Sequence, residues 1–438
     1  MGNRISKLTG FAGRLRGGFG EPGQLNTAIR LFAAEGVLIA LVNNIVNNNN
    51  NLFATRMGAS DFEISLVTSL PQLMGMLVLI PGSILTDRMP NKRRMVITTL
   101  LLLLSSYFVM AFTPFFSEYR LAAFIGMLTL SMGPMTLYNT CWQAYFSDVV
   151  PIEERNRAFT LRTKGTFFVS ILMPLVTGPL LAAVAASEGK IRMHQAFVWV
   201  ACGLLAVQVL VVKRISGGDV HSGNGISFKD LKAAAADLSR NKRFLGFAAV
   251  ALLFYLMWQS DWTLYYLGML YYLKLDEAWL SYVNVGGALI QFLTIGFWSR
   301  VNEKMGVRFG IIFGSLGLAL CPVSMIVSTS LPAGVGAPVF LIMNTLSNFA
   351  FATVALNMLQ CLLQVVPEKN KTLSIAIYTV LISFSNAVMP VVGVQVYTAF
   401  GADLRALHIT FWILFSARIV TTGLWTLRWW LLRHEPKL

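Results

Sequence analysis

Residues 82–94 read GSILTDRMPNKRR, a short and strongly basic segment that lies between two apolar runs. The runs cover residues 64–80 and 95–112. Each is long enough to cross a bilayer as a helix, which rises about 1.5 Å per residue. We therefore expect the basic segment to be a tight turn that joins two membrane-spanning helices.

The chain repeats itself at a fixed offset of 216 residues, which is the separation of Pro151 and Pro367. Four short matches share this offset without a gap: Val149-Val150-Pro151 with Val365-Val366-Pro367, Met173-Pro174 with Met389-Pro390, Thr129-Leu130-Ser131 with Thr345-Leu346-Ser347, and Asp87-Arg88-Met89 with Glu303-Lys304-Met305. A repeat of this length indicates two copies of one structural unit. Each copy is expected to hold six helices.

The basic segment has a characteristic spacing of small, apolar, acidic and basic residues. These are Ser83, Leu85, Asp87, Arg88, Lys92, Arg93 and Arg94. This spacing resembles the signature between the second and third helices of the major facilitator superfamily. Ser83 stands where that family usually has glycine, and Pro90 stands at its second glycine. The resemblance implies an all-α membrane protein with twelve transmembrane helices in two pseudo-repeated six-helix halves, and solute transport by alternating access.

The composition agrees with a membrane protein. Hydrophobic residues make up 55% of the 438 residues and charged residues 13%, which is too little polar surface for a soluble protein of this length. The formal charge of +15 does not indicate nucleic-acid binding, because the basic residues sit in alternate loops. The cysteines lie in apolar runs without metal or disulfide spacing, and we expect them to be small core residues.

The apolar runs predict twelve spans: 27–55, 64–85, 93–112, 119–146, 157–186, 193–212, 244–272, 277–298, 309–329, 338–364, 372–400 and 406–432. They form an N-terminal six-helix half, residues 27–212, and a C-terminal six-helix half, residues 244–432. Residues 1–26 and 433–438 are expected to be a cytoplasmic N-terminal segment and a cytoplasmic tail. Residues 213–243 are expected to be a cytoplasmic linker with a surface helix, because Ser227 and Asp230 resemble a capping box.

The distribution of basic residues predicts the orientation of the chain. Of the 35 Lys and Arg residues, 28 lie on the side of the N-terminus and six lie in the loops and helix ends of the other side. Short loops rich in Lys and Arg stay in the cytoplasm. We therefore expect a multi-pass protein with both termini in the cytoplasm, surrounded by lipid in the cell (plasma) membrane, and monomeric.

Asparagines on one face of the first span predict a solute-binding cavity. Asn43, Asn44, Asn47, Asn48 and Asn51 cover a face about 140° wide at 100° per residue. Such a face is too polar to contact lipid. The alternative is that these amides only form hydrogen bonds between helices, which contribute about 1 kcal/mol each in membranes.

Other spans that line the central cavity in the family carry polar residues of the same kind. These are Asn139, Gln143, Thr136, Thr140 and Trp142 in the fourth span, Gln259, Ser260 and Thr263 at the repeat positions of the asparagines in the seventh, and Asn344, Asn348 and Asn357 in the tenth. Amides, hydroxyls and indoles suit a neutral solute rich in hydroxyl groups. An anion would require fixed positive charge.

Three ionisable residues lie within spans and away from their ends: Glu35, Asp261 and Arg418. A carboxylate buried in a membrane can carry a proton between the two sides. Asp261 is the stronger candidate for proton coupling, because Trp258 and Tyr265 share its side of the helix. That grouping could equally hold a substrate cation, or Asp261 could only form hydrogen bonds to neighbouring helices. Glu35 lies about 150° from the asparagine face, and Arg418 is expected to be a structural or snorkelling charge.

The basic turns are expected to control access to the cavity. If the two halves rock about a central site, one side must be held shut in one state and released in the other. By the resemblance, Asp87 with Arg88 would latch the outward-facing state, and Asp148 with Arg155 would act in the matching turn after the fourth span. The alternative is that these charges only set the topology.

The sequence thus predicts a proton-coupled secondary transporter for a small neutral polar solute, such as a saccharide or glycoside. The first alternative is proton-coupled efflux of amphipathic or cationic drugs. The second is a membrane receptor or scaffold that does not transport. We expect no enzyme activity, no cofactor and no metal site, because the sequence contains no catalytic triad, phosphate loop or metal-ligand spacing.

Overall fold

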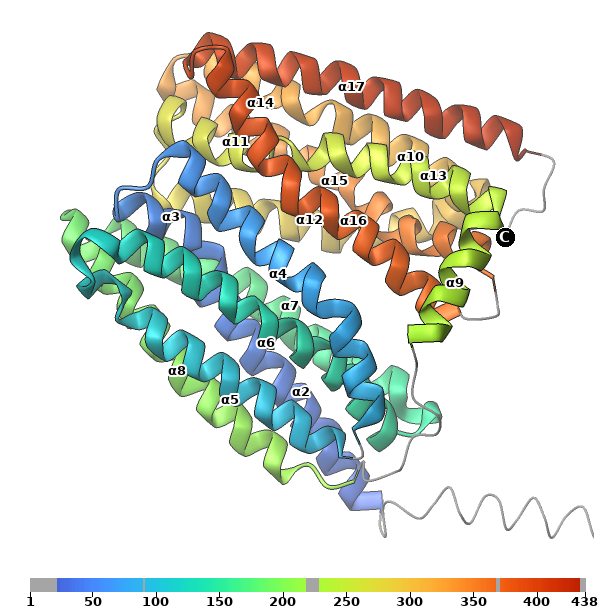
Figure 1. The fold of residues 1–438 in the computed structure, drawn as a ribbon. Helices are drawn as coiled ribbons and strands as arrows, with labels where there is room; N and C mark the ends of the chain where they lie inside the picture. Colours follow the sequence, from blue (N-terminus) through green and yellow to red (C-terminus); the bar gives the residue numbers. More distant parts are fainter. Residues whose placement is uncertain (1–21, 90, 218–227, 368–370, 434–438) are drawn as a thin grey trace, which may run out of the picture.

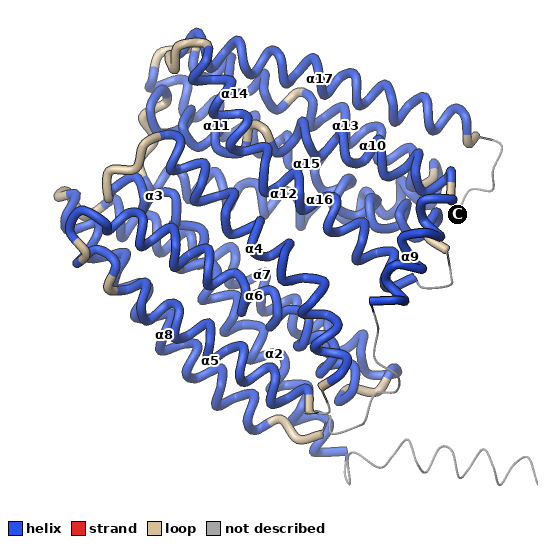
Figure 2. The backbone as a smooth tube through the Cα atoms, in the orientation of Figure 1, coloured by secondary structure: helices blue, strands red, loops and turns tan. Residues whose placement is uncertain are grey.

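The computed structural model describes residues 22–89, 91–217, 228–367 and 371–433. Within these ranges the regular structure is helical, and the connections are short (Figure 2). Twelve helical segments are long and apolar enough to cross a membrane, and each overlaps one of the predicted spans. The predicted all-α fold with twelve membrane-spanning helices is confirmed for this part of the chain.

The first six spans form the N-terminal half. They are α2 (Pro22–Ile45) with η1 (Asn47–Asn49) and α3 (Asn50–Arg56), α4 (Asp61–Arg88), α5 (Lys92–Ala111), α6 (Arg120–Val149), α7 (Ile152–Ala182) and α8 (Ser187–Arg214). The last six spans form the C-terminal half. They are α10 (Lys242–Gln259) with α11 (Trp262–Leu267) and a π-turn (Gly268–Tyr272), α12 (Glu277–Met305), α13 (Val307–Ala319) with α14 (Cys321–Thr329), α15 (Ala333–Val365), α16 (Lys371–Ala399) and α17 (Leu404–Leu431).

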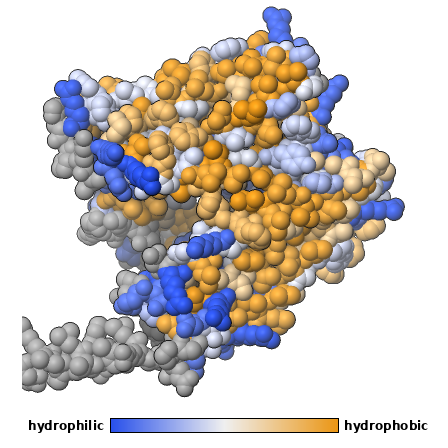
Figure 3. Space-filling model, turned by 180° about the vertical axis from the view of Figure 1, so that it is seen from behind, coloured by the Kyte–Doolittle hydropathy of each residue, from blue (hydrophilic) through white to orange (hydrophobic). Residues whose placement is uncertain are grey.

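The two halves lie side by side, and α4 packs against α16 while α7 packs against α12 (Figure 1). The start of α2, the end of α17 and the helix α9 (Phe228–Arg240) all lie at one end of the bundle (Figure 1). We call this end the linker end, and the other the opposite end. Figure 3 shows hydrophobic residues over the middle of one face, with hydrophilic residues gathered toward the two ends.

The helix α9 lies against the C-terminal half. Ala234 and Leu238 are buried, and α9 contacts α10 and α16. Asn241, which follows α9, donates a hydrogen bond from Nδ2 to the carbonyl oxygen of Val365 at 2.9 Å and caps the start of α10. Polar caps of this kind satisfy backbone groups that a helix end leaves without a partner.

Side-chain caps also begin spans at the opposite end. Ser60 and Glu63 form a reciprocal capping box at α4, and Asp276 accepts a hydrogen bond from the Trp279 backbone N–H at 2.9 Å at the start of α12. At the linker end, α12 and α13 are joined by Gly306, whose φ of 87° favours glycine. Gly306 is the repeat partner of Pro90 at the 216-residue offset, so the second half has glycine in this turn.

The first and seventh spans are interrupted at overlapping positions of the repeat. The first span breaks between Ile45 and Asn50, where a short 3-10 turn replaces the α-helix. The seventh breaks between Gln259 and Trp262, which correspond to positions 43 and 46. Interrupted spans expose backbone polar groups, and such segments are tolerated in a membrane only where protein or a cavity surrounds them. The breaks therefore indicate where a polar cavity can lie.

Several predicted features lie outside the described residues. These are the N-terminal segment up to residue 21, Pro90, the linker residues 218–227 with Ser227, the tail from residue 434 and the side chain of Asp87.

Candidate functional site

A cavity lies between the two halves, beside both helix breaks. It has a volume of about 490 Å³, and we call it the central cavity. Spans one, seven, eight, nine, ten and twelve contribute to its wall. A second hollow of about 230 Å³ adjoins it and shares Asn47, Asn48, Asn51 and Trp262. The volume of the central cavity is in the range of sites for small molecules, about 300–1,000 Å³.

The N-terminal half lines the central cavity with the amides of Asn47, Asn48 and Asn51. Asn47 donates to Oδ1 of Asn43 at 3.0 Å and accepts a hydrogen bond from the Tyr107 hydroxyl at 3.2 Å. These contacts hold the amide of Asn47 in one orientation. Asn47 and Asn48 are nevertheless exposed, so both can also reach a solute in the cavity.

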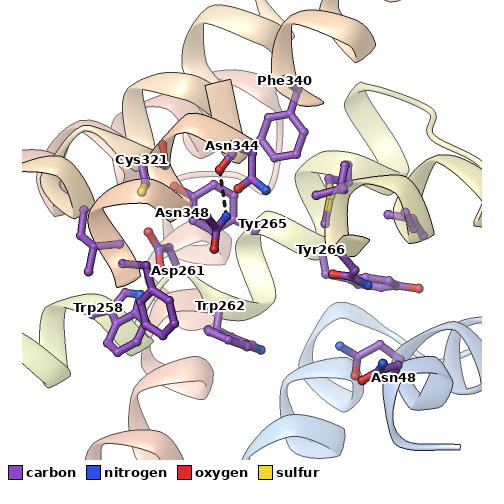
Figure 4. A pocket seen from close by; sticks show the side chains of 18 of the residues that line it. Asn48, Trp258, Asp261, Trp262, Tyr265, Tyr266, Cys321, Phe340, Asn344 and Asn348 are labelled. Atoms are coloured by element: carbon purple, nitrogen blue, oxygen red, sulfur yellow. Dashed lines mark hydrogen bonds between the residues drawn. The ribbon is translucent and has the colours of Figure 1, made fainter. Parts of the chain in front are cut away.

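The C-terminal half supplies a second group of amides opposite the first (Figure 4). Asn348 accepts a hydrogen bond from Gln291 at 2.7 Å and donates to the carbonyl oxygen of Asn344 at 2.8 Å. Aromatic rings stand next to these amides: Trp258, Trp262, Tyr265, Tyr266, Phe340 and Phe351. The wall therefore combines amide groups, which can donate and accept hydrogen bonds, with the apolar faces of aromatic rings.

Asp261 and Arg418 form a buried ion pair in the wall of the central cavity. Nη2 of Arg418 lies 2.5 Å from Oδ2 of Asp261, and both side chains are 2% exposed. An isolated charge at this depth would be very costly, whereas a hydrogen-bonded pair is not. The pair contributes one polar but electrically neutral unit to the wall. Arg418 is therefore buried and paired, and it does not extend toward the membrane surface.

The helix breaks explain why Arg418 binds in this position. Its Nη2 also donates to the carbonyl oxygen of Trp258 at 3.1 Å, in the last turn of α10, where carbonyl groups lack helical donors. Its Nη1 donates to the carbonyl oxygen of Leu318 at 2.9 Å. Pro322 follows four residues later and has no N–H to donate to that oxygen. Arg418 thus satisfies backbone groups at two interrupted spans.

Glu35 is the second buried carboxylate, and it lies inside the N-terminal half, away from the central cavity. It is 0% exposed, and its Oε1 accepts a hydrogen bond from Gln208 at 2.9 Å. Its Oε2 lies 3.5 Å from Nη2 of Arg162 and accepts no hydrogen bond from a described residue. The Arg162 guanidinium in turn lies 3.8 Å from the ring centroid of Trp142. Glu35 therefore has one oxygen available for a proton.

The halves are joined at the opposite end by an ion cluster, which we define as Arg56, Lys190 and Glu277. Glu277 begins α12 and is 2% exposed. Its two carboxylate oxygens lie 2.7 and 2.8 Å from Nζ of Lys190, and it also pairs with Arg56. The hydroxyls of Thr55 and Tyr266 meet nearby at 2.9 Å. Because Arg56 and Lys190 belong to one half and Glu277 to the other, these contacts hold the halves together there.

Some of the predicted binding residues line the central cavity, and others do not. Asn47 and Asn344 line the central cavity, and Gln259 lines a neighbouring hollow of about 430 Å³ between α10, α15 and α16. Six others do not line the central cavity: Asn43, Asn44, Asn139, Trp142, Gln143 and Thr263. Asn44 is directed toward α7, because its Nδ2 lies 3.3 Å from the Ser170 hydroxyl. Of the two proton-coupling candidates, Asp261 lines the cavity and Glu35 does not.

The residues predicted to control access lie within the N-terminal half. Arg88 is exposed at the end of α4. Asp148, near the end of α6, pairs with Lys92 at 2.8 Å. Arg155 donates from Nε to the carbonyl oxygen of Val150 at 3.0 Å and from Nη2 to that of Ser147 at 2.7 Å, so it caps the end of α6.

Sequence reasoning missed several residues of the wall. Asn284 and Gln291 in α12 line the central cavity, and their spacing of seven residues places them on one helix face. That spacing was a usable signal. Trp262 and Tyr266 also line the cavity but carried no such signal. Nor did Arg162, which lies beside Glu35 outside the cavity, because its role depends on contacts between distant spans. Among the described residues, no group of His, Cys, Asp and Glu side chains could hold a metal ion.

Comparisons with known proteins agree with this architecture. A family model described as the Major Facilitator Superfamily matches residues 31–360. A search of curated protein sequences finds no match.

Solved structures share the fold at low sequence identity. The nucleoside transporter NupG is 11% identical, with 92% of this chain and 99% of that chain covered and a TM-score of 0.72. A bacterial homologue of the iron transporter ferroportin, in an inward-facing state, is 10% identical with 91% and 98% covered and a TM-score of 0.71. A POT family transporter in complex with a thioalcohol-conjugated peptide is 12% identical, with 95% and 98% covered and a TM-score of 0.70. The family-model match over residues 31–360 shows that this chain belongs to the major facilitator superfamily, a family of membrane transporters.

Proposed function

We propose that this protein moves a small neutral polar solute, of the saccharide or glycoside class, across the cell membrane by proton-coupled alternating access. The linker end faces the cytoplasm in this proposal, because 28 of the 35 Lys and Arg residues lie on that side. The solute, the proton and the membrane lipid are its partners, and the protein acts as a monomer.

The observation that carries the proposal is the chemistry of the central cavity. Amides from both halves meet across it, and aromatic rings stand between them. Amide groups donate and accept hydrogen bonds, as sugar hydroxyls do, and indole rings cover the apolar faces of a sugar ring. The Asp261–Arg418 pair leaves the wall without net charge, which supports a neutral solute over an ion.

The ion cluster at the opposite end supports alternating access. Arg56, Lys190 and Glu277 hold the halves together at the end that would face outward, so in this proposal the described state corresponds to an inward-facing one. The predicted latch at Asp87 and Arg88 would form when the halves close at the linker end instead. Two sets of contacts at the two ends of the bundle would then alternate.

Proton coupling is assigned to the two buried carboxylates, and the contacts support Glu35 more than Asp261. Asp261 is already neutralised by Arg418 at 2.5 Å. Glu35 Oε2 accepts no hydrogen bond from a described residue, and Arg162 lies 3.5 Å away. Protonation of Glu35 would release Arg162, which joins α7 to α2, and α7 packs against α12 of the other half. The proton could thereby change the contact between the halves.

A thermal-shift experiment on the purified protein tests the solute class. A ligand at about 100 times its dissociation constant adds roughly 2.7 kcal/mol to the folded state. We expect stabilisation by neutral sugars or glycosides, and its loss in Asn48→Ala. Gln195→Ala is the matched control, since Gln195 donates to the carbonyl oxygen of Ala111 and does not line the cavity. No stabilisation by any sugar, or equal loss in the control, would refute the assignment.

One observation favours the alternative of efflux of amphipathic cations. Asp261 lines the central cavity with Trp258, Trp262 and Tyr265 close by, and a carboxylate among aromatic rings can hold a cation. A cation would then compete with Arg418 for Asp261. Stabilisation by amphipathic cations that disappears in Asp261→Asn would select this function over the first.

A further inference from the structure

A pocket of about 310 Å³ lies at the linker end of the C-terminal half and is separate from the central cavity. It is formed where α12 ends, α13 begins, and α15 and α17 end. Lys304, Arg308 and Arg433 line it, and none of the described residues in its wall is acidic. Glu303, next to Lys304, is exposed and does not line the pocket. Three cations therefore converge on one concave site.

The backbone of the pocket also favours an anion. The wall includes Gly306 and Val307, and Val307 is the first residue of α13, a helix of 13 residues. The first N–H groups of a helix have no helical acceptor and carry partial positive charge. Phosphate groups bind at such helix starts when cationic side chains stand beside them. Here the helix start and the three cations share one pocket.

The outer wall of the pocket is apolar and exposed. Met305 is 49% exposed, Trp429 is 39% exposed and Trp430, next to it, is 51% exposed. The Arg433 guanidinium lies 5.0 Å from the ring centroid of Trp430. Trp residues at the end of a span, next to Lys and Arg, mark the depth of the lipid headgroups in a membrane. The pocket therefore has cations on one side and hydrocarbon-facing side chains on the other.

We propose that this pocket binds the phosphate headgroup of an anionic phospholipid from the cytoplasmic leaflet. The phosphate would contact Lys304, Arg308 and Arg433, and the acyl chains would lie along Met305 and Trp429. Because the wall of the pocket is amphipathic, it favours a lipid over a soluble phosphate. The pocket shares no lining residue with the central cavity. The proposal rests on the orientation given above, with the linker end in the cytoplasm, and not on the identity of the transported solute.

Binding at this site would join four helix ends of one half. Nη1 of Arg308 already donates to the carbonyl oxygen of Leu432 at 2.9 Å, so the start of α13 is held against the end of α17. A phosphate between Arg308, Lys304 and Arg433 would strengthen that connection. The turn concerned, Glu303–Gly306, is the repeat partner of residues 87–90 within the basic segment at 82–94. The bound lipid would therefore stabilise the second copy of the turn that identifies the family.

Native mass spectrometry of the full chain in detergent tests the proposal, with phosphatidylglycerol and phosphatidylcholine of identical acyl chains as probes. We expect phosphatidylglycerol to bind at least tenfold more tightly. A basic residue near a membrane surface contributes about fivefold to the binding of an anionic lipid. The variant Lys304→Gln/Arg308→Gln/Arg433→Gln should therefore lose roughly 100-fold in affinity. Glycerol 3-phosphate and inorganic phosphate, tested separately, should bind far more weakly than the lipid.

The matched control removes three exposed cations elsewhere at the linker end, Lys213→Gln/Arg214→Gln/Lys232→Gln, and should leave the affinity unchanged. If the triple pocket variant does not fold, Arg433→Gln alone, at the exposed end of α17, should still lose about fivefold. Equal binding of the two lipids, or equal loss in the control, would overturn the proposal. Tight binding of inorganic phosphate alone would replace the lipid with a soluble anion and would also overturn it.

Discussion

Replacement of Glu277 by glutamine should open the opposite end of the transporter. Glu277 is 2% exposed and pairs with both Arg56 and Lys190, which come from the other half. Loss of its charge leaves two cations facing each other in a partly buried site. Removal of one partner of a buried ion pair costs about 3–5 kcal/mol. We take the lower value, about 3 kcal/mol. Arg56 is 27% exposed, so water screens its charge and reduces its contribution to the ion pair.

This cost falls on the state in which the opposite end is closed, because the same groups are hydrated once the halves separate. A difference of about 3 kcal/mol corresponds to a change of more than 100-fold in the ratio of the two states. Electron–electron distance measurements between spin labels at Glu118→Cys and Ser330→Cys, in the two halves, would detect it. The native cysteines Cys141, Cys202, Cys321 and Cys361 would first be replaced by alanine. We expect the distance distribution to move to longer values in Glu277→Gln.

Glu188→Gln is the matched control at the same end. Glu188 is 72% exposed and lies 3.9 Å from Arg120 of its own half, so its loss should not move the distances. The effect of Glu277→Gln should also shrink in a background that already carries Lys190→Gln, because the two residues are coupled. An unchanged distribution in Glu277→Gln, or the same shift in Glu188→Gln, would refute the reasoning.

Three further substitutions test other contacts. Arg418→Met should lower the free energy of unfolding by about 3–5 kcal/mol, because it leaves the Asp261 carboxylate and backbone carbonyl groups buried without a donor. Unfolding in detergent measures this, and the double variant with Asp261→Asn should recover part of the loss. Glu35→Gln should abolish solute accumulation driven by a pH gradient in proteoliposomes and keep the exchange of labelled solute; unchanged accumulation would exclude Glu35 as the proton carrier. Gly178→Ala should favour opening at the opposite end, since its methyl group would lie 2.6 Å from Cβ of Ser281 in the other half; unchanged spin-label distances would contradict this.

The fold could be predicted because its signals are local or periodic. Apolar runs mark the spans, and the 216-residue repeat marks the two halves. It was harder to predict which side chains of a span face the cavity. A helical projection at 100° per residue assumes an unbroken helix. The first span breaks between Ile45 and Asn50, and Asn44 is directed toward α7 while Asn47 and Asn48 line the cavity.

The pairing of ionisable residues could not be predicted at all. Asp261 and Arg418 are 157 residues apart, and no repeat partner or spacing connects them. Their contact arises because the interrupted seventh and ninth spans present carbonyl groups that need a donor. The same holds for Glu35, Gln208 and Arg162, which come from three different spans. Such contacts depend on how helices pack, and one sequence read alone contains no record of them.

Arg418 extends from α17 to Asp261 and to the end of α10. This contact has a consequence for how this transporter can evolve. A lipid-facing helix at the edge of the bundle supplies the group that fixes Asp261 and the end of α10. Neighbours of Arg418 on α17, such as Thr421 and Thr422, both bonded to its carbonyl oxygen, can therefore alter the shape of the cavity without touching a solute. Selection for growth on a new compound should recover substitutions at such buried positions of α17 as well as in the cavity wall.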